Sequence, residues 1–353
     1  MAETSITVNR QVRLASRPVG MATRDNWQFT EEPVREPAEG QVLVKNLLLS
    51  LDPAMRGWMN EGRSYIPPVA IGEVMRAGGI GRVLASRHPG FAPGDYVAGM
   101  LGVQAYCVTG EAKVPGAGLE RVDPALAPLP KWLNALGMPG MTAYFGLLDV
   151  GKPRQGETVV VSGAAGAVGQ TVGQIARIKG CRVIGIAGGA EKCRLLTAEL
   201  GFDAAIDYRS EDVAARLKEL CPKGIDVFFD NVGGEILDAA LARLAMRGRV
   251  VLCGAIARYS DDRPAPGPGN YLNLLMRRGR MEGFIVIDYL PRAAEAVGAL
   301  AGWLREGKLK DRIDLQEGFE QVPAALIRLF TGENRGKQLV KIGDAPTGLG
   351  GRP

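Results

Sequence analysis

Three glycines, Gly163, Gly166 and Gly169, stand three residues apart where an apolar run gives way to helical spacing. Glycines in such a turn either allow tight packing or let an anion approach the backbone. The first turn of a helix has unpaired N–H groups and a partial positive charge, which stabilise a phosphate. The turn by itself does not decide between packing and phosphate binding.

The elements around this turn favour phosphate binding. From about residue 140 to 290, strands and helices alternate, and each strand is a nearly continuous apolar run, as in a parallel sheet covered by helices on both faces. We therefore predict a doubly wound, parallel six-stranded α/β sheet of the Rossmann type. Because the glycine turn follows its first strand, the turn is predicted to hold the pyrophosphate of a dinucleotide. The predicted strands are 158–163, 182–189, 204–208, 225–234, 248–255 and 282–288, and the predicted helices are 166–179, 191–200, 210–220 and 235–245.

The sequence on either side of this region indicates a second domain. Residues from about 6 to 130 contain short strands divided by Gly, Pro and Asp, which indicates a barrel-like or sandwich domain. After a helix near 291–306, the short strand KQLVKI (337–342) cannot form a core alone and is predicted to return to that domain. The doubly wound unit would then be inserted in it. We assign 1–130 and 308–353 to the β-rich substrate domain, and 131–307 to the dinucleotide-binding domain.

The tip of the second predicted strand indicates which dinucleotide is bound. Cofactors without a 2′-phosphate usually meet an acidic residue there. This strand instead ends in Gly188 and Gly189, followed by Glu191, Lys192 and Arg194. Small residues and cations suit a 2′-phosphate, so the prediction is NADPH. Glu191 has a plainer alternative role as a cap of the following helix.

Composition excludes several other classes of protein. The 353 residues carry a net charge of +5 spread along the chain, and the basic patch 277–280 has no interleaved aromatic residue, so we interpret it as a solvated helix end and expect no nucleic-acid partner. The N-terminus lacks the apolar core of a signal peptide, and no apolar stretch approaches ~20 residues, so no membrane span is predicted. Five scattered cysteines suit free thiols in a reducing cytoplasm.

A metal site is not expected. His88 is the single histidine and lies in a turn-rich stretch next to proline. Without a second histidine or clustered thiols, a zinc ion would depend mostly on carboxylates, which is unusual. His88 is interpreted as a surface loop residue, so acid–base catalysis by histidine is not expected either.

Beyond these patterns, the sequence resembles the medium-chain dehydrogenase/reductase superfamily over almost its whole length. Within it, the chain is similar to the zinc-free branch of prostaglandin reductases, plant alkenal double-bond reductases and bacterial curcumin-type reductases. The resemblance implies a GroES-like barrel for the β-rich domain and a homodimer. The stretches that carry it are LSLDPAMRGWMN (49–60), SYIPPVAIGEVM (64–75), GMPGMTAYFGL (137–147), SGAAGAVGQ (162–170), FDNVGGEILD (229–238), CGAIARYS (253–260), GFIVIDY (283–289) and GENRGKQLV (332–340).

The resemblance also implies which residues contact the cofactor. Three of these residues also have a purely structural interpretation: Tyr208 could pack at a strand end, Asn231 could belong to a turn, and Asn334 could belong to a loop. The implied contacts are Gly163, Gly166, Ala167, Val168 and Gly169 on the pyrophosphate; Lys192 and Tyr208 on the 2′-phosphate; Asn231 on the ribose; Cys253, Gly254, Ala255, Ile256 and Tyr259 together with Phe284, Ile285 and Val286 beside the nicotinamide; and Asn334 closing over the cofactor.

The implied reaction is reduction of a carbon–carbon double bond conjugated to a carbonyl. Hydride reaches the β-carbon from NADPH, negative charge develops on the carbonyl oxygen, and a fixed hydrogen-bond donor at that oxygen lowers the barrier. Tyrosine, protonated at neutral pH, is the candidate donor. Tyr259 is the first choice because it follows the carboxyl end of the fifth strand, and Tyr65 is the second. Apolar walls of a pocket between the domains are expected from Trp58, Met138 and Tyr289.

One departure and two alternatives remain at this stage. The family stretch usually reads Asp-Pro-Tyr-Met-Arg, but Ala54 stands here in place of the tyrosine, so substrate preference does not carry over. The first alternative is an NADPH-dependent quinone reductase of the same superfamily. The second is a non-catalytic NADPH-binding sensor that regulates a partner.

Overall fold

The computed structural model of the chain describes residues 8–62, 64–110, 118–261 and 266–344. Contacts divide the chain into two compact units, each described here by itself. The first unit consists of Met1–Leu133, Asp314–Glu333 and Gln338–Pro353. The second consists of Asn134–Ile313 and Asn334–Lys337.

The second unit is built on a parallel six-stranded sheet in the order β10-β9-β8-β11-β12-β13. The first strand in the chain, β8, lies in the middle of the sheet, so the chain runs first to one edge and then to the other, as in a doubly wound fold. The predicted fold class is confirmed. The strands are β8 (Thr158–Ser162), β9 (Arg182–Ala187), β10 (Ala204–Asp207), β11 (Ile225–Asp230), β12 (Leu244–Leu252) and β13 (Arg280–Gly283).

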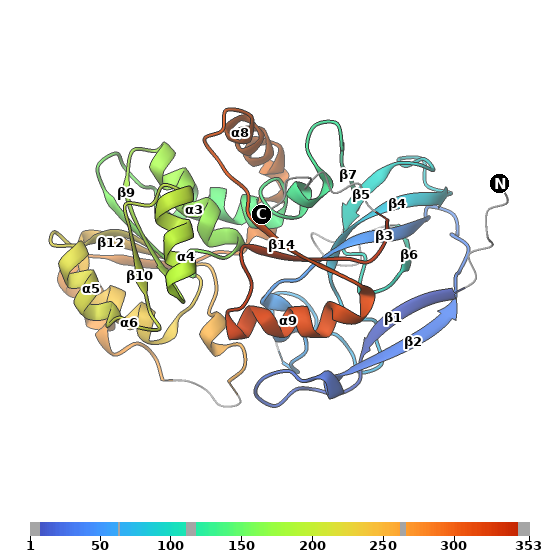
Figure 1. The fold of residues 1–353 in the computed structure, drawn as a ribbon, viewed down its shortest axis with the longest axis horizontal. Helices are drawn as coiled ribbons and strands as arrows, with labels where there is room; N and C mark the ends of the chain where they lie inside the picture. The colour runs from blue at the N-terminus through green and yellow to red at the C-terminus, as the bar shows by residue number, and fades with distance from the viewer. Residues whose placement is uncertain (1–7, 63, 111–117, 262–265, 345–353) are drawn as a thin grey trace. The chain divides into compact units, whose positions relative to one another are not determined.

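Helices connect these strands and cover the sheet (Figure 1). Helix α3 (Ala167–Ile178) packs on β8 and β9, and α2 (Met138–Phe145) packs on α3. Helix α4 (Ala190–Arg194) continues as a π-helix over Leu195–Glu199, so the predicted helix 191–200 exists with a wider last turn. The other α-helices among the described residues of the unit are α5 (Val213–Leu220), α6 (Gly234–Ala242), α7 (Leu272–Arg277) and α8 (Ala293–Arg305).

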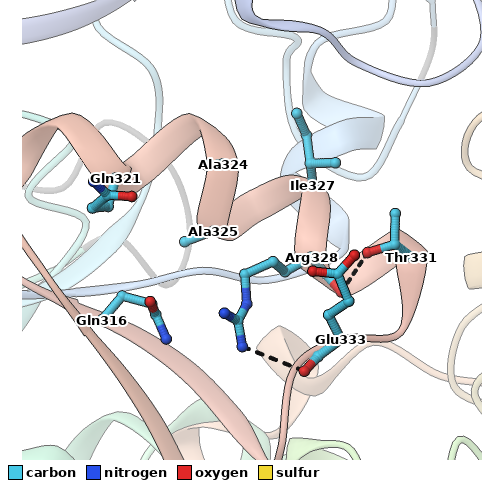
Figure 2. A pocket seen from close by; sticks show the side chains of 8 residues that line it. All are labelled: Gln316, Gln321, Ala324, Ala325, Ile327, Arg328, Thr331 and Glu333. Carbon is cyan, nitrogen blue, oxygen red and sulfur yellow. Dashed lines mark hydrogen bonds between the residues drawn. The ribbon is translucent and has the colours of Figure 1, made fainter.

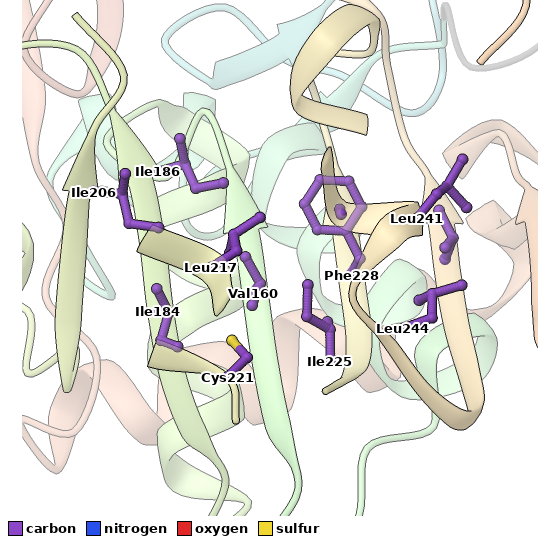
Figure 3. Packing of buried hydrophobic residues seen from close by; sticks show 12 residues of the cluster. Val160, Ile184, Ile186, Ile206, Leu217, Cys221, Ile225, Phe228, Leu241 and Leu244 are labelled. Carbon is purple, nitrogen blue, oxygen red and sulfur yellow. The ribbon is translucent and has the colours of Figure 1, made fainter. Parts of the chain in front are cut away.

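The core of this unit explains the nearly continuous apolar strands. Val160, Ile184, Ile206 and Phe228 are fully buried between the sheet and α5 and α6, as Figure 3 shows. Strands that are buried on both faces have no place for alternating polar residues. The strong strand signal in the sequence therefore comes from this packing.

The predicted sixth strand, 282–288, is wrong in its position. Strand β13 is Arg280–Gly283, and a 3₁₀ helix follows at Val286–Arg292. β13 lies at the edge of the sheet and pairs with β12 only up to Leu252, which is opposite Gly283. Beyond that point the chain has no strand to pair with, and the Phe284 ring instead packs edge-on against Phe229.

The first unit is β-rich. Its main sheet has the order β14-β15-β3-β4-β5-β7, with β6 also on β3, and the β3–β4 and β15–β3 pairs are antiparallel. Strand β15 comes from the end of the chain, so the tail returns to this unit. The strands are β3 (Val42–Ser50), β4 (Gly78–Ser86), β5 (Tyr96–Gly99), β6 (Tyr106–Thr109), β7 (Glu120–Arg121), β14 (Ile313–Glu317) and β15 (Lys337–Lys341), with β1 (Val8–Leu14) and β2 (Trp27–Pro33) as a separate pair.

The part of the first unit that the structure describes also contains the α-helices α1 (Ala54–Trp58) and α9 (Val322–Thr331). Helix α9 was not predicted from the sequence, although its buried residues Val322, Ala325 and Leu326 have helical spacing. No helix in the described ranges is both long and apolar enough to cross a membrane.

Candidate active site

The glycine turn between β8 and α3 uses its glycines in different ways. Gly163 has a φ of 58°, in the left-handed region that favours glycine. A Cβ on Gly169 would lie 2.4 Å from the Gly163 carbonyl oxygen, so only glycine lets the helix approach the turn this closely. The packing interpretation therefore applies to Gly169.

The start of α3 also fits a pyrophosphate. Gly166 is the N-cap, no side chain caps the helix, and Gly166, Ala167 and Val168 are partly exposed. The first-turn N–H groups of this twelve-residue helix can therefore donate to phosphate oxygens without displacing a side chain. Packing and phosphate binding are compatible because they rest on different residues of one turn.

At the tip of β9, a tyrosine covers the two glycines. A Cβ on Gly188 would come within 2.8 Å of the Tyr208 ring, and Gly189 has a φ of 96°. Tyr208 follows β10, is 45% exposed, and brings its hydroxyl to the start of the segment that carries Lys192. The predicted 2′-phosphate residues therefore lie at two adjacent strand ends.

A carboxylate also lies at this edge. Asp207 Oδ1 accepts hydrogen bonds from the backbone N–H groups of Gly189, at 2.7 Å, and Arg209, at 3.0 Å. The Gly189 bond is the main reason why the pKa of Asp207 lies below its usual value. This carboxylate binds the protein's own backbone.

Asn231 is held by a buried network at the ends of β8 and β11. Its Nδ2 donates to the Ser162 carbonyl oxygen at 2.7 Å, and its backbone N–H donates to Ser162 Oγ at 2.8 Å. Ser162 Oγ in turn donates to Asp230 Oδ1 at 2.7 Å. The amide of Asn231 is thereby fixed at the carboxyl edge of the sheet.

Asp230 organises this network and was missed in the sequence. Its side chain is fully buried and accepts backbone hydrogen bonds from Val232 and Gly233 at the start of α6. Burial raises the pKa of Asp230, and these donors oppose that effect. The sequence did offer one indication of its importance, because Asp230 is a charged residue at the end of the apolar run IDVFFD. No comparable pattern marks its partner Ser162.

The segment after β12 carries the candidate donor. The backbone N–H groups of Cys253 and Gly254 donate to the Asp230 carbonyl oxygen, at 2.9 and 3.1 Å, so the segment is fixed on β11. The Tyr259 hydroxyl accepts the Ala255 N–H at 3.3 Å, and a Cβ on Gly254 would lie 3.1 Å from it. The phenol therefore lies over Gly254 and Ala255.

The segment after β13 forms an aromatic cluster. Tyr289 stacks on Phe145 at 4.7 Å between centroids and meets Phe284 edge-on at 6.2 Å. Phe284, Ile285 and Val286 are partly buried. Met138, the first residue of α2, accepts the Thr142 hydroxyl at its carbonyl oxygen, at 2.7 Å.

Asn334 lies in the short return of the chain to the second unit. It is 9% exposed, and its Nδ2 donates to the Gly336 carbonyl oxygen at 2.9 Å. This bond stabilises the turn and agrees with the loop-residue alternative. Contact with a cofactor stays a prediction.

Two of the predicted residues, Trp58 and Tyr65, belong to the first unit. Trp58 is 7% exposed, and its Nε1 donates to the Tyr65 hydroxyl at 3.2 Å. Burial raises the pKa of Tyr65, which therefore stays protonated at neutral pH. Ala54 is partly exposed at the start of α1.

The single histidine and one cavity lie outside the set of predicted site residues. His88 Nδ1 accepts the Gly90 N–H at 2.9 Å, and no group of three or more metal-ligating residues lies together in the described ranges. A cavity of about 370 Å³ in the first unit lies beside α9 (Figure 2), but none of the predicted residues lines it.

Comparison with protein families gives two matches. Residues 10–116 match the N-terminal domain of oxidoreductase, and residues 167–301 match a family described as zinc-binding dehydrogenase. Together the two matches cover more than half of the chain.

Individual relatives cover nearly the whole chain. The chain is 44% identical to the NADPH-dependent curcumin reductase of Escherichia coli, over 95% of this chain and 97% of the relative. It is 40% identical to the NADP(+)-dependent 2-alkenal reductase of Nicotiana tabacum, over the same shares of each. The crystal structure of CurA from Vibrio vulnificus in complex with NADPH is similar with a TM-score of 0.88 and 42% identity, over 95% of this chain and 99% of that one.

Proposed function

The chain belongs to the zinc-independent branch of the medium-chain dehydrogenase/reductase superfamily, and from that premise we propose that it reduces the carbon–carbon double bond of α,β-unsaturated ketones or aldehydes with NADPH. Relatives named for curcumin and 2-alkenal reduction support this proposal. The single observation that carries it is the Tyr259 hydroxyl, fixed over Gly254 and Ala255 just beyond β12.

The proposed cofactor contacts follow the carboxyl edge of the sheet. When bound, NADPH would supply the hydride that the β-carbon of the substrate accepts. The first turn of α3 binds the pyrophosphate, and Asn231 offers its amide to a ribose. The remaining proposed contacts are Gly163, Lys192, Tyr208, Cys253, Gly254, Ala255, Ile256, Phe284, Ile285, Val286 and Asn334.

Tyr259 supplies the polar step. Its O–H donates to the substrate carbonyl oxygen as negative charge develops there, which stabilises the enolate. The α-carbon of the enolate then takes a proton from water or a nearby hydroxyl, which completes the reduction. The Ala255 N–H, which donates to the phenol oxygen, polarises the hydroxyl and strengthens it as a donor. Tyr65 remains the second candidate, with Trp58 fixing its hydroxyl. Met138 and Tyr289 remain proposed apolar contacts of the substrate.

Tyr259→Phe tests this assignment. Turnover of a 2-alkenal, followed by loss of nicotinamide absorbance, should fall about 10²–10³-fold, as when one oxyanion donor is removed. NADPH affinity, measured by fluorescence titration, should change less than about twofold. Tyr96→Phe, in β5, serves as the control. Unchanged turnover in Tyr259→Phe would remove the residue from the mechanism.

A substrate panel separates the proposal from its alternatives. Alkenals, cyclic enones, aryl enones and quinones are offered to the wild-type enzyme with NADPH. Turnover of enones supports the proposal, and turnover of quinones alone would make the protein a quinone reductase. NADPH binding without turnover of any of these would favour a sensor.

A homodimer is part of the proposal. Strand β13 is an edge of the six-stranded sheet, and exposed apolar side chains gather on and around the neighbouring α7. Exposed apolar groups beside a sheet edge suit a second copy of the chain. Leu275→Glu with Met276→Glu should convert a dimer to a monomer in light scattering, whereas a monomeric wild type would refute this part. The exposed residues are Met246, Tyr271, Leu272, Leu275 and Met276.

The cysteines suit a reducing compartment. All five are free, and Cys107, Cys181 and Cys221 are buried. Burial raises the pKa of Cys107 to about 12 and the pKa of Cys181 and Cys221 to about 11, so these thiols are poorly reactive. A cytoplasmic location is therefore proposed.

A further inference from the structure

The short segment Asn334–Lys337 presents an arginine from a fixed turn. The Lys337 N–H donates to the Arg312 carbonyl oxygen at 2.9 Å. Gly336 has a φ of 94°, and a Cβ there would lie 2.3 Å from the same oxygen. The Asn334 side chain, on the other side of Arg335, donates to the Gly336 carbonyl oxygen at 2.9 Å, so the backbone that carries Arg335 is held in a fixed direction.

Arg312 is in turn fixed on the helix that begins at the glycine turn. Gln170 of α3 is 1% exposed, and its amide both accepts the Arg312 N–H and donates to the Arg312 carbonyl oxygen, each at 3.0 Å. The segment that carries Arg335 is therefore attached to the proposed pyrophosphate helix.

Arg335 forms an ion pair at the tip of β9. Its Nη2 lies 2.8 Å from Glu191 Oε2. The two side chains are 67% and 55% exposed, and ion pairs this exposed contribute little to stability. The Arg335–Glu191 pair joins two segments that are distant in the chain, and its small contribution to stability does not explain why it forms.

The position of the Glu191 carboxylate suggests a role for the ion pair in cofactor binding. A carboxylate just beyond the second strand of this fold can accept hydrogen bonds from the ribose hydroxyls of NADH, and it repels a 2′-phosphate. Glu191 stands two residues after Gly189, next to Lys192. The guanidinium of Arg335 lies against that carboxylate.

We propose that Arg335 determines cofactor specificity: it neutralises Glu191 and adds a guanidinium to the 2′-phosphate site, so that NADPH is preferred over NADH. This inference rests on the proposed placement of the 2′-phosphate beside Lys192 and Tyr208. Guanidinium groups suit phosphate because their N–H groups match its oxygens in pairs. Further charged residues near these strand ends are Arg194, Asp207, Arg209 and Glu211, whose carboxylate accepts the Asp207 N–H at 2.7 Å.

The test compares NADPH and NADH affinity in Arg335→Ala by fluorescence titration at low salt. The dissociation constant for NADPH should rise about tenfold or more, as for loss of one charge-assisted hydrogen bond. That for NADH should stay the same or fall, because Glu191 becomes available to the ribose. A ratio of the two constants within about twofold of wild type would overturn the proposal.

Two further variants separate neutralisation from direct contact. In Arg335→Ala with Glu191→Gln, removal of the carboxylate should restore part of the NADPH affinity, so the two changes are not additive. Arg335→Lys should retain most of the preference, because the charge stays. Equal NADPH affinity in the double and single variants would contradict the role of Glu191.

Arg177→Ala is the matched control. Arg177 pairs with Asp203 at 2.9 Å in the same unit, with side chains 46% and 32% exposed, but the pair lies at the far end of α3. Its loss should leave the NADPH-to-NADH ratio unchanged. Because binding is measured without substrate, an enzyme that binds NADPH but reduces no enone would refute the proposed function and leave this inference standing.

Discussion

Two pairs of strand ends in the same sheet are built in opposite ways. At β8 and β11, the buried residues Ser162 and Asp230 join the strands through short hydrogen bonds. At β9 and β10, the exposed residues Glu191 and Tyr208 share the surface with several charged side chains. The pyrophosphate and riboses are common to NADH and NADPH, and a rigid backbone suits their binding. Discrimination between NADH and NADPH depends instead on charged side chains at the 2′-position, which can be substituted without disturbing the fold. The buried end should therefore affect folding, and the exposed end should affect selectivity.

The strongest test of this contrast is Asp230→Ala. It leaves the Val232 and Gly233 N–H groups and the Ser162 hydroxyl without their acceptor, at a cost of about 3 kcal/mol or more. Thermal and urea unfolding would measure the loss. Asp230→Asn, which retains one acceptor oxygen, should lose less. An unchanged unfolding midpoint in Asp230→Ala would break the contrast.

Gly169→Ala is the next largest change. The added Cβ meets the Gly163 carbonyl oxygen at 2.4 Å and the Ala164 Cα at 2.7 Å, and backbone atoms like these have little room to move away. Overpacking of this kind costs about 1–3 kcal/mol. Urea unfolding should show the destabilisation, and NADPH affinity should fall as the turn is displaced. A variant as stable as wild type would show that the close approach is not required.

At the exposed end, Lys192→Ala should leave stability nearly unchanged. NADPH affinity should fall about tenfold, while NADH affinity changes far less, because only NADPH carries the 2′-phosphate. Fluorescence titration with both cofactors measures the difference. Equal losses for the two would refute the 2′-phosphate assignment.

The smallest expected effect is that of Gly188→Ala. Its Cβ also meets a neighbour at 2.8 Å, but that neighbour is the exposed ring of Tyr208, which can move. Stability should change by less than about 0.5 kcal/mol, with a few-fold loss of NADPH affinity. Comparison with Gly169→Ala isolates the effect of burial, since the substitution is identical. Equal destabilisation by the two would remove the distinction between the two ends.

The sequence predicts the sheet well because strands that are buried on both faces consist of consecutive apolar residues, in runs such as VVV and VFF. It fails at β13, where an edge strand stops when its neighbour stops, and no local pattern records where β12 ends. Glycine spacing likewise predicts the turn before α3 but does not separate the packing role of Gly169 from the exposed position of Gly166.

Contacts between side chains that are far apart in the chain could not be predicted from the sequence. Ser162 meets Asp230, and Arg335 meets Glu191, only because distant strands and segments come together. Neither serine nor arginine carries a spacing signal in its own stretch. Candidate residues that belong to a family motif could be identified from the sequence. The residues that position or neutralise them could be identified only from the structure.

The return of β15 to β3 has a consequence for synthesis. Strand β3 leaves the ribosome long before its neighbour β15, which lies near the end of the chain. The strands of the doubly wound sheet, in contrast, all lie on one continuous stretch and can assemble while translation continues. Premature termination shortly before β15 would therefore leave the earliest-made part of the polypeptide with an open sheet edge, which is a site for aggregation and for recognition by chaperones.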